Sequence, residues 1–298
     1  MPSVVNLDGR IVLPSEAVVS VFDRGFLYGD SVYEVIRTYG MRPFETAAHL
    51  ARLAHSAERI GLELRWDMAR TAAEIERVLE ASRGGDAPAP GAAPWNVGER
   101  YIRVVMTRGA GEIGVDPTLA ADPLALVIVQ PLSGPTRSEY RSGVEARIVG
   151  VEHTGPRTVD PTAKTGSRIE NVLAVREARA AGAHEALMLD RQGFVTEGAT
   201  SNVFRVKDGR LETPPLDAGI LQGVTRGVVL RLAAEQQLPV AERRLTPADL
   251  AAADELFITS TMREILPVVR LDGASVGTGS PGPLTFRLHR AFRKLASG

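Results

Sequence analysis

Residues 160–202 constrain this chain more than any other stretch, because they place a lysine, a predicted helix, two short predicted strands and the glutamate Glu197 in succession. The lysine is Lys164, one of only three lysines among 35 basic residues. An arginine stays protonated, whereas a lysine that is removed from water can lose its proton and attack a carbonyl group. Most lysines are solvated surface residues, but a lysine kept in an arginine-rich chain is a candidate nucleophile.

The residues that follow Lys164 predict its local structure. Ser167 and Glu170 match a helix capping box, and an apolar pattern of helical spacing follows them. Lys164 is therefore expected in a loop just before a helix. A strand is expected over 195–206, which places Glu197 at a strand end.

The composition excludes several classes of protein. The chain is 44% apolar and 24% charged with a net charge of -1, which is typical of a soluble globular protein and gives no electrostatic case for nucleic acid or an anionic membrane as a partner. The absence of cysteine excludes thiolate chemistry and disulfides. No targeting or membrane-spanning segment is recognised, so a cytoplasmic protein is expected. The five histidines lack metal-ligand spacing, and no metal site is expected.

The N-terminal half predicts strands and amphipathic helices. Alternation over 31–39 places Glu34 on one face of a strand, and Tyr33 and Arg37 on the other. A face with tyrosines and an arginine suits a polar pocket or an ordinary exposed strand. Arg52 lies off the apolar stripe of a helix over 46–61, where an arginine is most often solvated.

Residues 108–114 match a dinucleotide-binding pattern through three glycines after a strand. That fingerprint requires a helix that starts at the glycines and points its N-terminus at a pyrophosphate. Pro117 and its neighbours interrupt any such helix. The segment is therefore predicted to be a glycine-rich loop between two strands.

Two domains are predicted from the length of 298 residues and the distribution of turn residues. An N-terminal domain covers 1–131, a linker with glycine and proline covers 132–142, and a C-terminal domain covers 143–298. In the latter, Val224 and Thr225 occupy the first turn of a helix, which favours an anion such as phosphate, although every helix has such a turn.

Six ordered motifs together resemble the fold type IV pyridoxal-phosphate enzymes, the class IV aminotransferases. These are Asp-Arg-Gly-x-x-Tyr-Gly-Asp-x-Val-Tyr-Glu at 23–34, His49-Leu-x-Arg-Leu53, Lys164 with the helix after it, Glu197-Gly-x-x-x-Asn202-Val-Phe, Gly223-Val-Thr-Arg226 and Ser260-Thr-x-x-Glu-Ile265. The resemblance covers nearly the whole chain. It implies an α/β fold of the α+β type, with a small N-terminal α/β domain, a larger C-terminal domain and assembly as a homodimer or higher homo-oligomer.

The resemblance also implies roles for the cofactor-binding residues. Lys164 would bind pyridoxal 5'-phosphate covalently and move the proton at the substrate α-carbon. Glu197 would face the pyridine nitrogen and keep it protonated. The residues implied for the phosphate are Arg52, Val224, Thr225, Ser260 and Thr261.

The substrate residues are divided between two subfamilies. Tyr101, Arg103 and Arg37, with amides near Thr261 and Met262, resemble the branched-chain enzymes. Tyr33 and Arg108 resemble the D-amino-acid enzymes instead. Ile169 also departs from the branched-chain pattern, which has a tyrosine five residues after the lysine.

The function implied is a transaminase that moves an amino group between an amino acid and a 2-oxo acid such as 2-oxoglutarate, with branched-chain or other aliphatic L-amino acids ahead of the alternatives. Those alternatives are, in order, a D-amino-acid aminotransferase and an aminodeoxychorismate lyase. A non-enzymatic or dinucleotide-binding module is a distant further alternative, motivated by residues 109–114.

Overall fold

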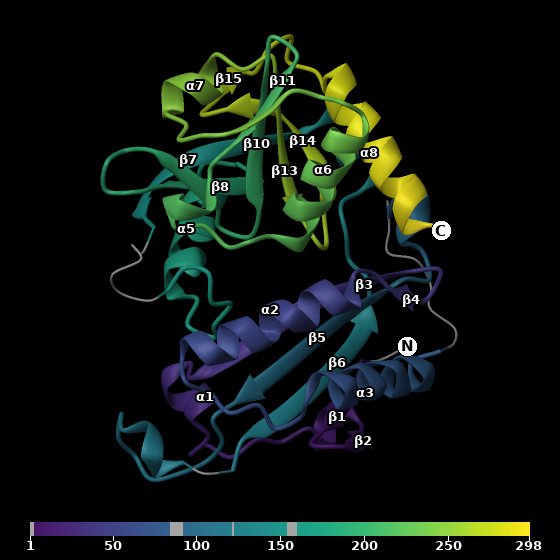
Figure 1. The fold of residues 1–298 in the computed structure, drawn as a ribbon, viewed down its shortest axis with the longest axis vertical. Helices are drawn as coiled ribbons and strands as arrows, with labels where there is room; N and C mark the ends of the chain where they lie inside the picture. Colours follow the sequence, from purple (N-terminus) through teal and green to yellow (C-terminus); the bar gives the residue numbers. More distant parts are fainter. Residues whose placement is uncertain (1–2, 84–91, 121, 154–159) are drawn as a thin grey trace. The chain divides into compact units, whose positions relative to one another are not determined.

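The computed structural model of the chain describes residues 3–83, 92–120, 122–153 and 160–298. The chain forms two compact units (Figure 1). Unit 1 contains Met1–Ser133 together with Ala163–Arg168, and unit 2 contains Gly134–Thr162 and Ile169–Gly298. The short segment around Lys164 thus belongs to the first unit, although it lies far along the sequence. The domain boundaries expected from the sequence stay a prediction.

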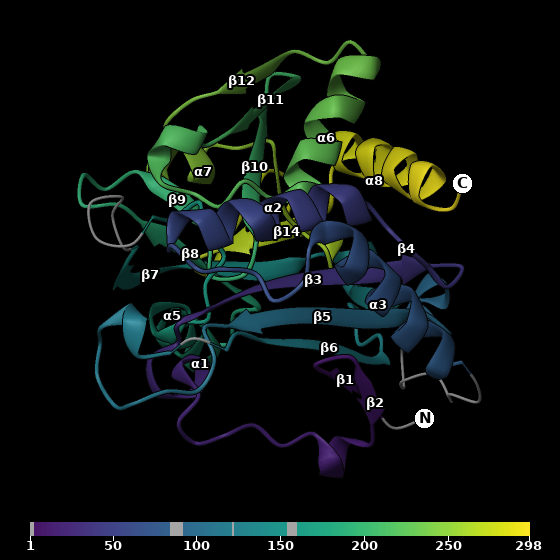
Figure 2. The ribbon, with the colours of Figure 1, turned by 60° about the horizontal axis from the view of Figure 1, so that its bottom comes forward.

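Unit 1 is built on one antiparallel sheet. Among the described residues its strand order is β2-β1-β6-β5-β3-β4, and β3, β5 and β6 lie side by side in Figure 2. The strands are β1 (Val4–Leu7), β2 (Arg10–Val12), β3 (Ser31–Tyr39), β4 (Arg42–Pro43), β5 (Arg100–Thr107) and β6 (Leu124–Pro131). The helices are α1 (Arg24–Tyr28), α2 (Thr46–Arg59) and α3 (Met68–Ala81), with the 3-10 turns η1 (Pro14–Glu16), η2 (Pro94–Asn96) and η3 (Pro117–Leu119).

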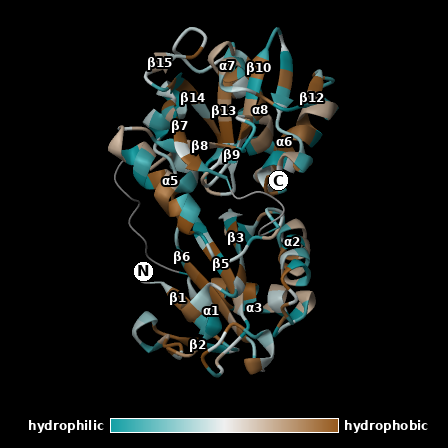
Figure 3. Cartoon of the chain, turned by 90° about the vertical axis from the view of Figure 1, so that its left-hand side faces the viewer, coloured by the Kyte–Doolittle hydropathy of each residue, from teal (hydrophilic) through white to brown (hydrophobic). Residues whose placement is uncertain are grey.

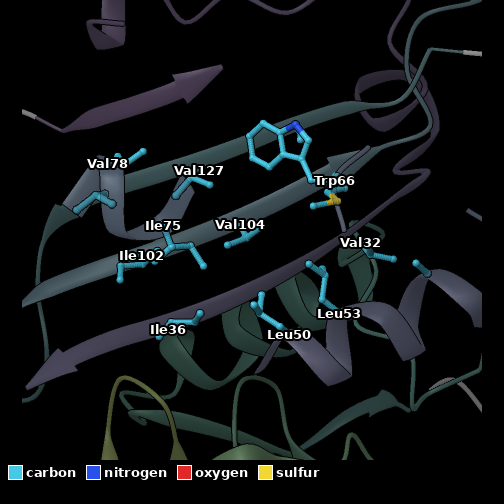
Figure 4. Packing of buried hydrophobic residues seen from close by; sticks show 14 of the residues in the cluster. Val32, Ile36, Leu50, Leu53, Trp66, Ile75, Val78, Ile102, Val104 and Val127 are labelled. Atoms are coloured by element: carbon cyan, nitrogen blue, oxygen red, sulfur yellow. The ribbon is translucent and has the colours of Figure 1, made fainter. Parts of the chain in front are cut away.

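The core of unit 1 lies between the sheet and the helices α2 and α3. Every second residue of β3 and β5 points into it, and Figure 4 shows Val32, Ile36, Ile102 and Val104 there. Leu50 and Leu53 approach from α2, while Ile75 and Val78 approach from α3. The period of two in the strands and of 3.6 in the helices explains why one face of each element is apolar. The side chains on the opposite face of the sheet are therefore not part of this core.

A short helix, α1, lies within the first of the six motifs, at residues 23–34. The Asp23 carboxylate caps it by accepting a hydrogen bond from the backbone N–H of Gly25 over 2.7 Å. The helix ends at Gly29, whose φ of 69° is in the left-handed region that favours glycine. Its length of five residues is too short for sequence periodicity to reveal.

The glycine-rich segment 108–114 is a loop between strands, as predicted. The strands before and after it, β5 and β6, are antiparallel neighbours, with Thr107 opposite Leu124. No helix begins at these glycines. This arrangement excludes the parallel βαβ unit that dinucleotide binding at this segment would need.

Unit 2 contains a mixed sheet with the strand order β12-β11-β10-β13-β14-β7-β8-β9 and with β15 paired to β14. Figure 3 shows mainly hydrophobic residues along β13, and α6 and α8 lie against each other in Figure 1. The strands are β7 (Val144–Glu152), β8 (Glu185–Leu189), β9 (Val195–Gly198), β10 (Asn202–Lys207), β11 (Arg210–Thr213), β12 (Val240–Glu242), β13 (Glu255–Ser260), β14 (Glu264–Leu271) and β15 (Ala274–Ser275). The helices are α4 (Arg137–Ser142), α5 (Ile169–Ala180), α6 (Val224–Glu235), α7 (Pro247–Ala251) and α8 (Pro283–Ala296), with the 3-10 turn η4 (Leu216–Ala218).

Two local predictions in unit 2 were wrong. The strand expected over 195–206 is divided into β9 and β10 by a turn, and at this turn the Ser201 hydroxyl donates to the buried carboxylate of Glu185 over 2.9 Å. The helix α5 begins at Ile169, so Ser167 precedes it by two residues and does not occupy the N-cap position of the expected capping box. Helix termini of this kind are the least predictable part of a sequence pattern.

Helix α4 lies within the segment expected to be a linker. Thr136 caps it, and Glu139 completes a capping box by accepting from the backbone N–H of Thr136 over 2.6 Å. Across the described helices of both units, a search for one with the length and hydropathy of a membrane span found none.

Candidate active site

The residues expected at the site fall into two sets, one in each unit. Unit 1 contains Lys164, Arg52, Tyr33, Arg37, Tyr101, Arg103 and Arg108. Unit 2 contains Glu197, Val224, Thr225, Ser260, Thr261 and Met262.

The backbone of Lys164 is fixed by two elements of unit 1. Its N–H donates to the Ser56 hydroxyl on α2 over 3.0 Å, and its carbonyl accepts from the N–H of Tyr33 on β3, also over 3.0 Å. The side-chain nitrogen lies 4.5 Å from the centre of the Tyr33 ring. Burial lowers the pKa of the Lys164 amine, although the nearby Tyr33 phenol opposes this. A lowered pKa increases the fraction of neutral amine, the form that attacks a carbonyl group.

Tyr33 is buried among positive charges. The guanidinium carbon of Arg103 lies 4.1 Å from the centre of its ring. Burial raises the pKa of the Tyr33 phenol, but Lys164, Arg168 and Arg103 outweigh it, and the net effect is a lowered pKa. A more acidic phenol beside a less basic amine forms a pair that can exchange a proton.

Glu34 follows Tyr33 on β3 but faces the core and is 0% exposed. Its carboxylate accepts two hydrogen bonds from Arg52, over 2.6 and 2.8 Å, and one from Nδ1 of His49 over 2.8 Å. Burial alone would raise the pKa of Glu34, but Arg52 and His49 outweigh it and lower the pKa to about 2. Burial in turn lowers the pKa of His49, so its neutral ring donates the Nδ1 proton to the carboxylate. The network therefore fixes the direction of the Arg52 guanidinium.

No functional role was predicted from the sequence for Glu34, His49 or Ser56. One signal was present, because Glu34 lies between Val32 and Ile36 on the face of the strand that points into the core. A buried charge is retained in proteins only where partners satisfy it. The partner on α2 could be assigned only from the folded chain.

The register of the sheet in unit 1 groups four predicted substrate residues on one face. Val35 pairs with Arg103 and Arg37 pairs with Tyr101, so these side chains share the face of Tyr33. This is the face opposite the core. The two faces deduced from alternation in residues 31–39 are confirmed.

Arg37 and Arg108 are engaged in unit 1 in different ways. Arg37 is 1% exposed, donates to the Asn96 side chain over 3.0 Å and stacks 4.2 Å from the centre of the Tyr39 ring. Arg108 donates twice to the Asp30 carboxylate, over 2.6 and 3.0 Å, and also to the carbonyl groups at the end of α2. The Arg108 guanidinium thus joins α2 to the loop before β3.

In unit 2, Glu197 lies on β9 and is buried. Its Oε2 accepts hydrogen bonds from the Asn202 side chain and from the backbone N–H of Leu221, each over 3.1 Å. The ring of His153 approaches Oε1 to 3.9 Å. These neighbours all present N–H groups, which favours the ionised carboxylate.

Val224 and Thr225 form the first turn of α6, as predicted. The N-cap residue is Gly223, which has no side chain to cap this turn. A Cβ atom at Gly223 would collide with Oδ1 of Asn202, so the backbone must pass close to that side chain. The uncapped N-terminus of a twelve-residue helix is suited to a phosphate group.

Ser260 is the last residue of β13, and two further predicted site residues, Thr261 and Met262, lie in the turn after it. The next residue, Arg263, pairs with the buried carboxylate of Glu185 over 2.8 Å, and its carbonyl accepts from the Tyr140 hydroxyl over 3.0 Å. Glu264 is buried with a φ of 55° and contacts Nε2 of His289 over 2.7 Å. Contacts on both sides therefore fix the backbone of this turn.

The family described as amino-transferase class IV matches residues 31–271 of the chain. The chain belongs to the class IV aminotransferases. This class IV aminotransferase is 39% identical to a protein named putative branched-chain-amino-acid aminotransferase from Methanocaldococcus jannaschii, over 98% of this chain and 96% of the relative. It is 34% identical to a D-alanine aminotransferase from Bacillus licheniformis, over 97% of this chain and 95% of the relative.

A solved structure also resembles this aminotransferase. It is a T.th. branched-chain amino acid aminotransferase complexed with N-(5'-phosphopyridoxyl)-L-glutamate, with a TM-score of 0.90 at 29% identity over 100% of this chain and 95% of that chain. The expected fold type IV architecture, with mixed helix and sheet, is confirmed.

This class IV aminotransferase uses pyridoxal 5'-phosphate as its cofactor. When bound, the cofactor stabilises negative charge at the substrate α-carbon. The residues present fit it chemically. Lys164 has an amine with a lowered pKa, Glu197 is a buried carboxylate among N–H donors, and Gly223 opens an uncapped helix N-terminus. These groups match the aldehyde, the ring nitrogen and the phosphate.

Proposed function

We propose that this aminotransferase moves amino groups between branched-chain or other aliphatic L-amino acids and a 2-oxo acid such as 2-oxoglutarate. The observation that carries the proposal is the different environment of two arginines. Arg103 lies over the Tyr33 ring, which the Lys164 amine also contacts, and among the described residues its guanidinium makes no ion pair. Arg108, the arginine of the D-amino-acid pattern, is bound to Asp30.

The Arg103 guanidinium, which has no ion pair among the described residues, suits the second carboxylate of glutamate or 2-oxoglutarate. A guanidinium recognises a carboxylate through two parallel hydrogen bonds, and this needs N–H groups that are not already used by the protein. Arg108 has only one N–H group left, too few for such a pair, because four of its five N–H groups donate to protein oxygens. The relative from Methanocaldococcus jannaschii and the L-glutamate adduct of the solved structure support the same substrate class.

The proposed roles follow from the two sets of residues. Lys164 attaches the cofactor through its amine and then moves the proton at the substrate α-carbon, with Tyr33 able to hold that proton. Glu197 holds the ring nitrogen. The proposed phosphate-binding residues are Arg52, Val224, Thr225, Ser260 and Thr261. The remaining proposed substrate residues are Arg37, Tyr101 and Met262.

Half-reactions of the cofactor-loaded enzyme with L-leucine and D-alanine test the substrate class. We expect L-leucine to convert the cofactor to its amine form, which is followed by its absorbance, and 2-oxoglutarate to restore it. Conversion by D-alanine without conversion by L-leucine would replace this proposal with a D-amino-acid aminotransferase. That second candidate is favoured by the similarity to the enzyme from Bacillus licheniformis.

We also propose that the chain assembles as a homodimer or a higher homo-oligomer. A run of apolar side chains in unit 1 is exposed to solvent in the single chain, and monomeric proteins seldom leave such a patch uncovered. Its members are Val18, Val21, Phe22, Phe26 and Val115, the last two being 69% and 85% exposed. The cytoplasmic location expected from the sequence is likewise a proposal, which cell fractionation tests.

A further inference from the structure

His153 lies at the end of β7 in unit 2, between two carboxylates, and its ring is buried. Its Nε2 lies 3.0 Å from the carbonyl oxygen of Gly219 and 3.9 Å from Oε1 of Glu197. Its Nδ1 lies 3.4 Å from Oε1 of Glu170, in the first turn of α5. The sequence analysis gave His153 no role.

These contacts determine which ring nitrogens carry protons. A carbonyl oxygen only accepts hydrogen bonds, so Nε2 must carry a proton to bond with Gly219. If Nδ1 were unprotonated, its lone pair would face the negative carboxylate of Glu170. A proton on both nitrogens makes both contacts attractive, so the imidazolium form of His153 fits this site.

A charged His153 acts on Glu197. Oε2 of Glu197 already accepts hydrogen bonds from Asn202 and Leu221, and the imidazolium approaches Oε1. A positive charge at this distance favours the ionised carboxylate over the protonated one. If the Glu197 carboxylate shares a proton with a group that is hydrogen-bonded to it, the positive charge therefore favours the state in which that group carries the proton.

We propose that His153 is a positioning residue, whose positive charge keeps Glu197 ionised so that the proton of the pair stays on the ring nitrogen of bound pyridoxal phosphate. This inference rests on the proposed contact of Glu197 with that nitrogen. A protonated ring is the better acceptor of electrons from the substrate α-carbon. His153 would thus affect the reaction through the protonation of the ring nitrogen, without contacting the substrate.

Protonation of the cofactor ring nitrogen should then depend on pH, because it depends on the charge of His153. Within the described part of the chain, the groups that face His153 are Glu170 from α5, Glu197 from β9 and the Gly219 carbonyl after η4. Burial lowers the pKa of His153, but the two glutamates outweigh it, and the net effect is a raised pKa. The imidazolium is therefore fully present below about pH 6.5, the value of a free histidine, and is lost only as the pH rises through the higher value in the folded protein.

The test uses enzyme loaded with pyridoxal phosphate that carries 15N in its ring, because the 15N chemical shift reports protonation of that nitrogen. His153→Gln keeps an N–H group for the Gly219 carbonyl but removes the charge. At neutral pH we expect the ratio of protonated to unprotonated ring nitrogen to fall about tenfold, the equivalent of one pKa unit. The wild-type shift should approach that of the variant as the pH rises. An unchanged shift in His153→Gln would overturn the inference.

Two further variants distinguish the possible failures. His184→Gln is the matched control, because His184 also pairs with a glutamate, Glu139, over 3.3 Å, and it should keep the wild-type shift. Glu197→Gln should deprotonate the ring nitrogen. If it keeps the wild-type shift, the proposed role of Glu197 fails together with the inference. If Glu197→Gln changes the shift and His153→Gln does not, only the inference fails.

Glu170→Gln provides a second test if His153→Gln does not fold. Removal of this carboxylate should lower the pKa of His153, so the pH-dependent change of the ring 15N shift should move to lower pH. If the ring 15N shift of Glu170→Gln changed at the same pH as that of the wild type, the inference would be overturned.

Discussion

The Lys164 amine combines a fixed backbone with a lowered pKa. Its N–H and carbonyl are bonded to α2 and β3, so the side chain starts from a defined point, and burial favours the neutral amine. Both properties suit the proposed role of Lys164 as a nucleophile that also carries a proton. Neither would be provided by a solvated lysine such as Lys207, which pairs with Asp254 over 2.9 Å at the surface.

Lys164→Ala should lower kcat by at least about a thousandfold, because covalent attachment and proton transfer are both removed. The visible absorbance of bound cofactor should be lost together with the activity. Lys207→Ala is the control and should retain both. A variant at Lys164 that kept its rate would remove this residue from the proposed mechanism.

Glu34→Gln tests the buried network beside Lys164. The pKa of Glu34 is lowered from 4.5 to about 2, and a shift of that size corresponds to about 3 kcal/mol of folding free energy. The lowered pKa means that this contribution is present above about pH 4.5 and is lost as the pH falls toward about 2. Unfolding by denaturant should show Glu34→Gln less stable by about 3 kcal/mol at neutral pH, with a difference that shrinks on acidification.

Glu76→Gln supplies the control for that measurement. Glu76 is an exposed residue of α3, and its substitution should change the free energy of unfolding by less than about 0.5 kcal/mol. A stability difference for Glu34→Gln that stayed constant from neutral pH to acid would contradict the assigned ion pair with Arg52.

Arg103→Gln tests the proposed contact with the second carboxylate. We expect kcat/KM for 2-oxoglutarate to fall about 10- to 100-fold, the effect of losing a hydrogen bond to a charged group of about 1.5 to 3 kcal/mol. The value for an aliphatic 2-oxo acid, which lacks that carboxylate, should change much less. Equal losses for the two acceptors would show that Arg103 has a different role.

At the scale of elements, the N-terminus of α6 is shaped by a contact that only glycine permits. The Asn202 side chain occupies the space where a Cβ of Gly223 would lie, and the same side chain donates to Glu197. The start of this helix and the end of β9 are thus coupled through one amide. A substitution at the start of α6 or at the end of β9 should therefore alter both the proposed phosphate contact and the proposed ring-nitrogen contact.

Gly223→Ala should therefore displace Asn202 and weaken pyridoxal phosphate binding by at least about tenfold, equivalent to about 1.4 kcal/mol. Gly227→Ala is a matched control in the same helix, because a Cβ there meets no atom within 4 Å. Alanine is the better helix former, so Gly227→Ala should stabilise the protein by about 0.5 to 1 kcal/mol and leave cofactor affinity unchanged. Equal dissociation constants in titrations of the two variants would contradict the coupling.

At the scale of the whole molecule, the exposed apolar run in unit 1 is the surface at which we propose that another copy binds. Phe26→Asp introduces a charge there and should shift the assembly toward monomers in sedimentation experiments, because burial of an unpaired carboxylate is unfavourable. Phe286→Asp is the control, since Phe286 is a partly exposed phenylalanine on α8 in unit 2. A wild-type mass that is monomeric, or that Phe26→Asp leaves unchanged, would remove this run from the proposed interface.

The sequence predicted much of the fold from local rules. Helix α2 and strand β3 follow from apolar periodicity, and the structure confirms them. The wrong predictions concern termini and turns. The start of α5 and the break between β9 and β10 depend on contacts beyond the local pattern, such as the hydrogen bond from Ser201 to Glu185, sixteen residues earlier.

Part of the candidate site was also predictable from the sequence. Lys164 and Glu197 were assigned from ordered motifs, because the chemistry of the cofactor requires those residue types, and their roles stay predictions. Their neighbours Glu34 and His153 were not recognised. Each is a buried ionisable group whose partners lie on other elements, so its environment exists only after folding.

By itself, the sequence determined the two strand faces around Tyr33, the family and its cofactor, and a rare lysine in a loop before a helix. The tertiary structure decided the surroundings of these residues. It left the Arg103 guanidinium without an ion pair among the described residues, engaged Arg108 with Asp30, and placed His153 between two glutamates. The physical reason is that residue type and spacing specify chemistry and local conformation, whereas desolvation and charge pairing depend on elements brought together across the chain.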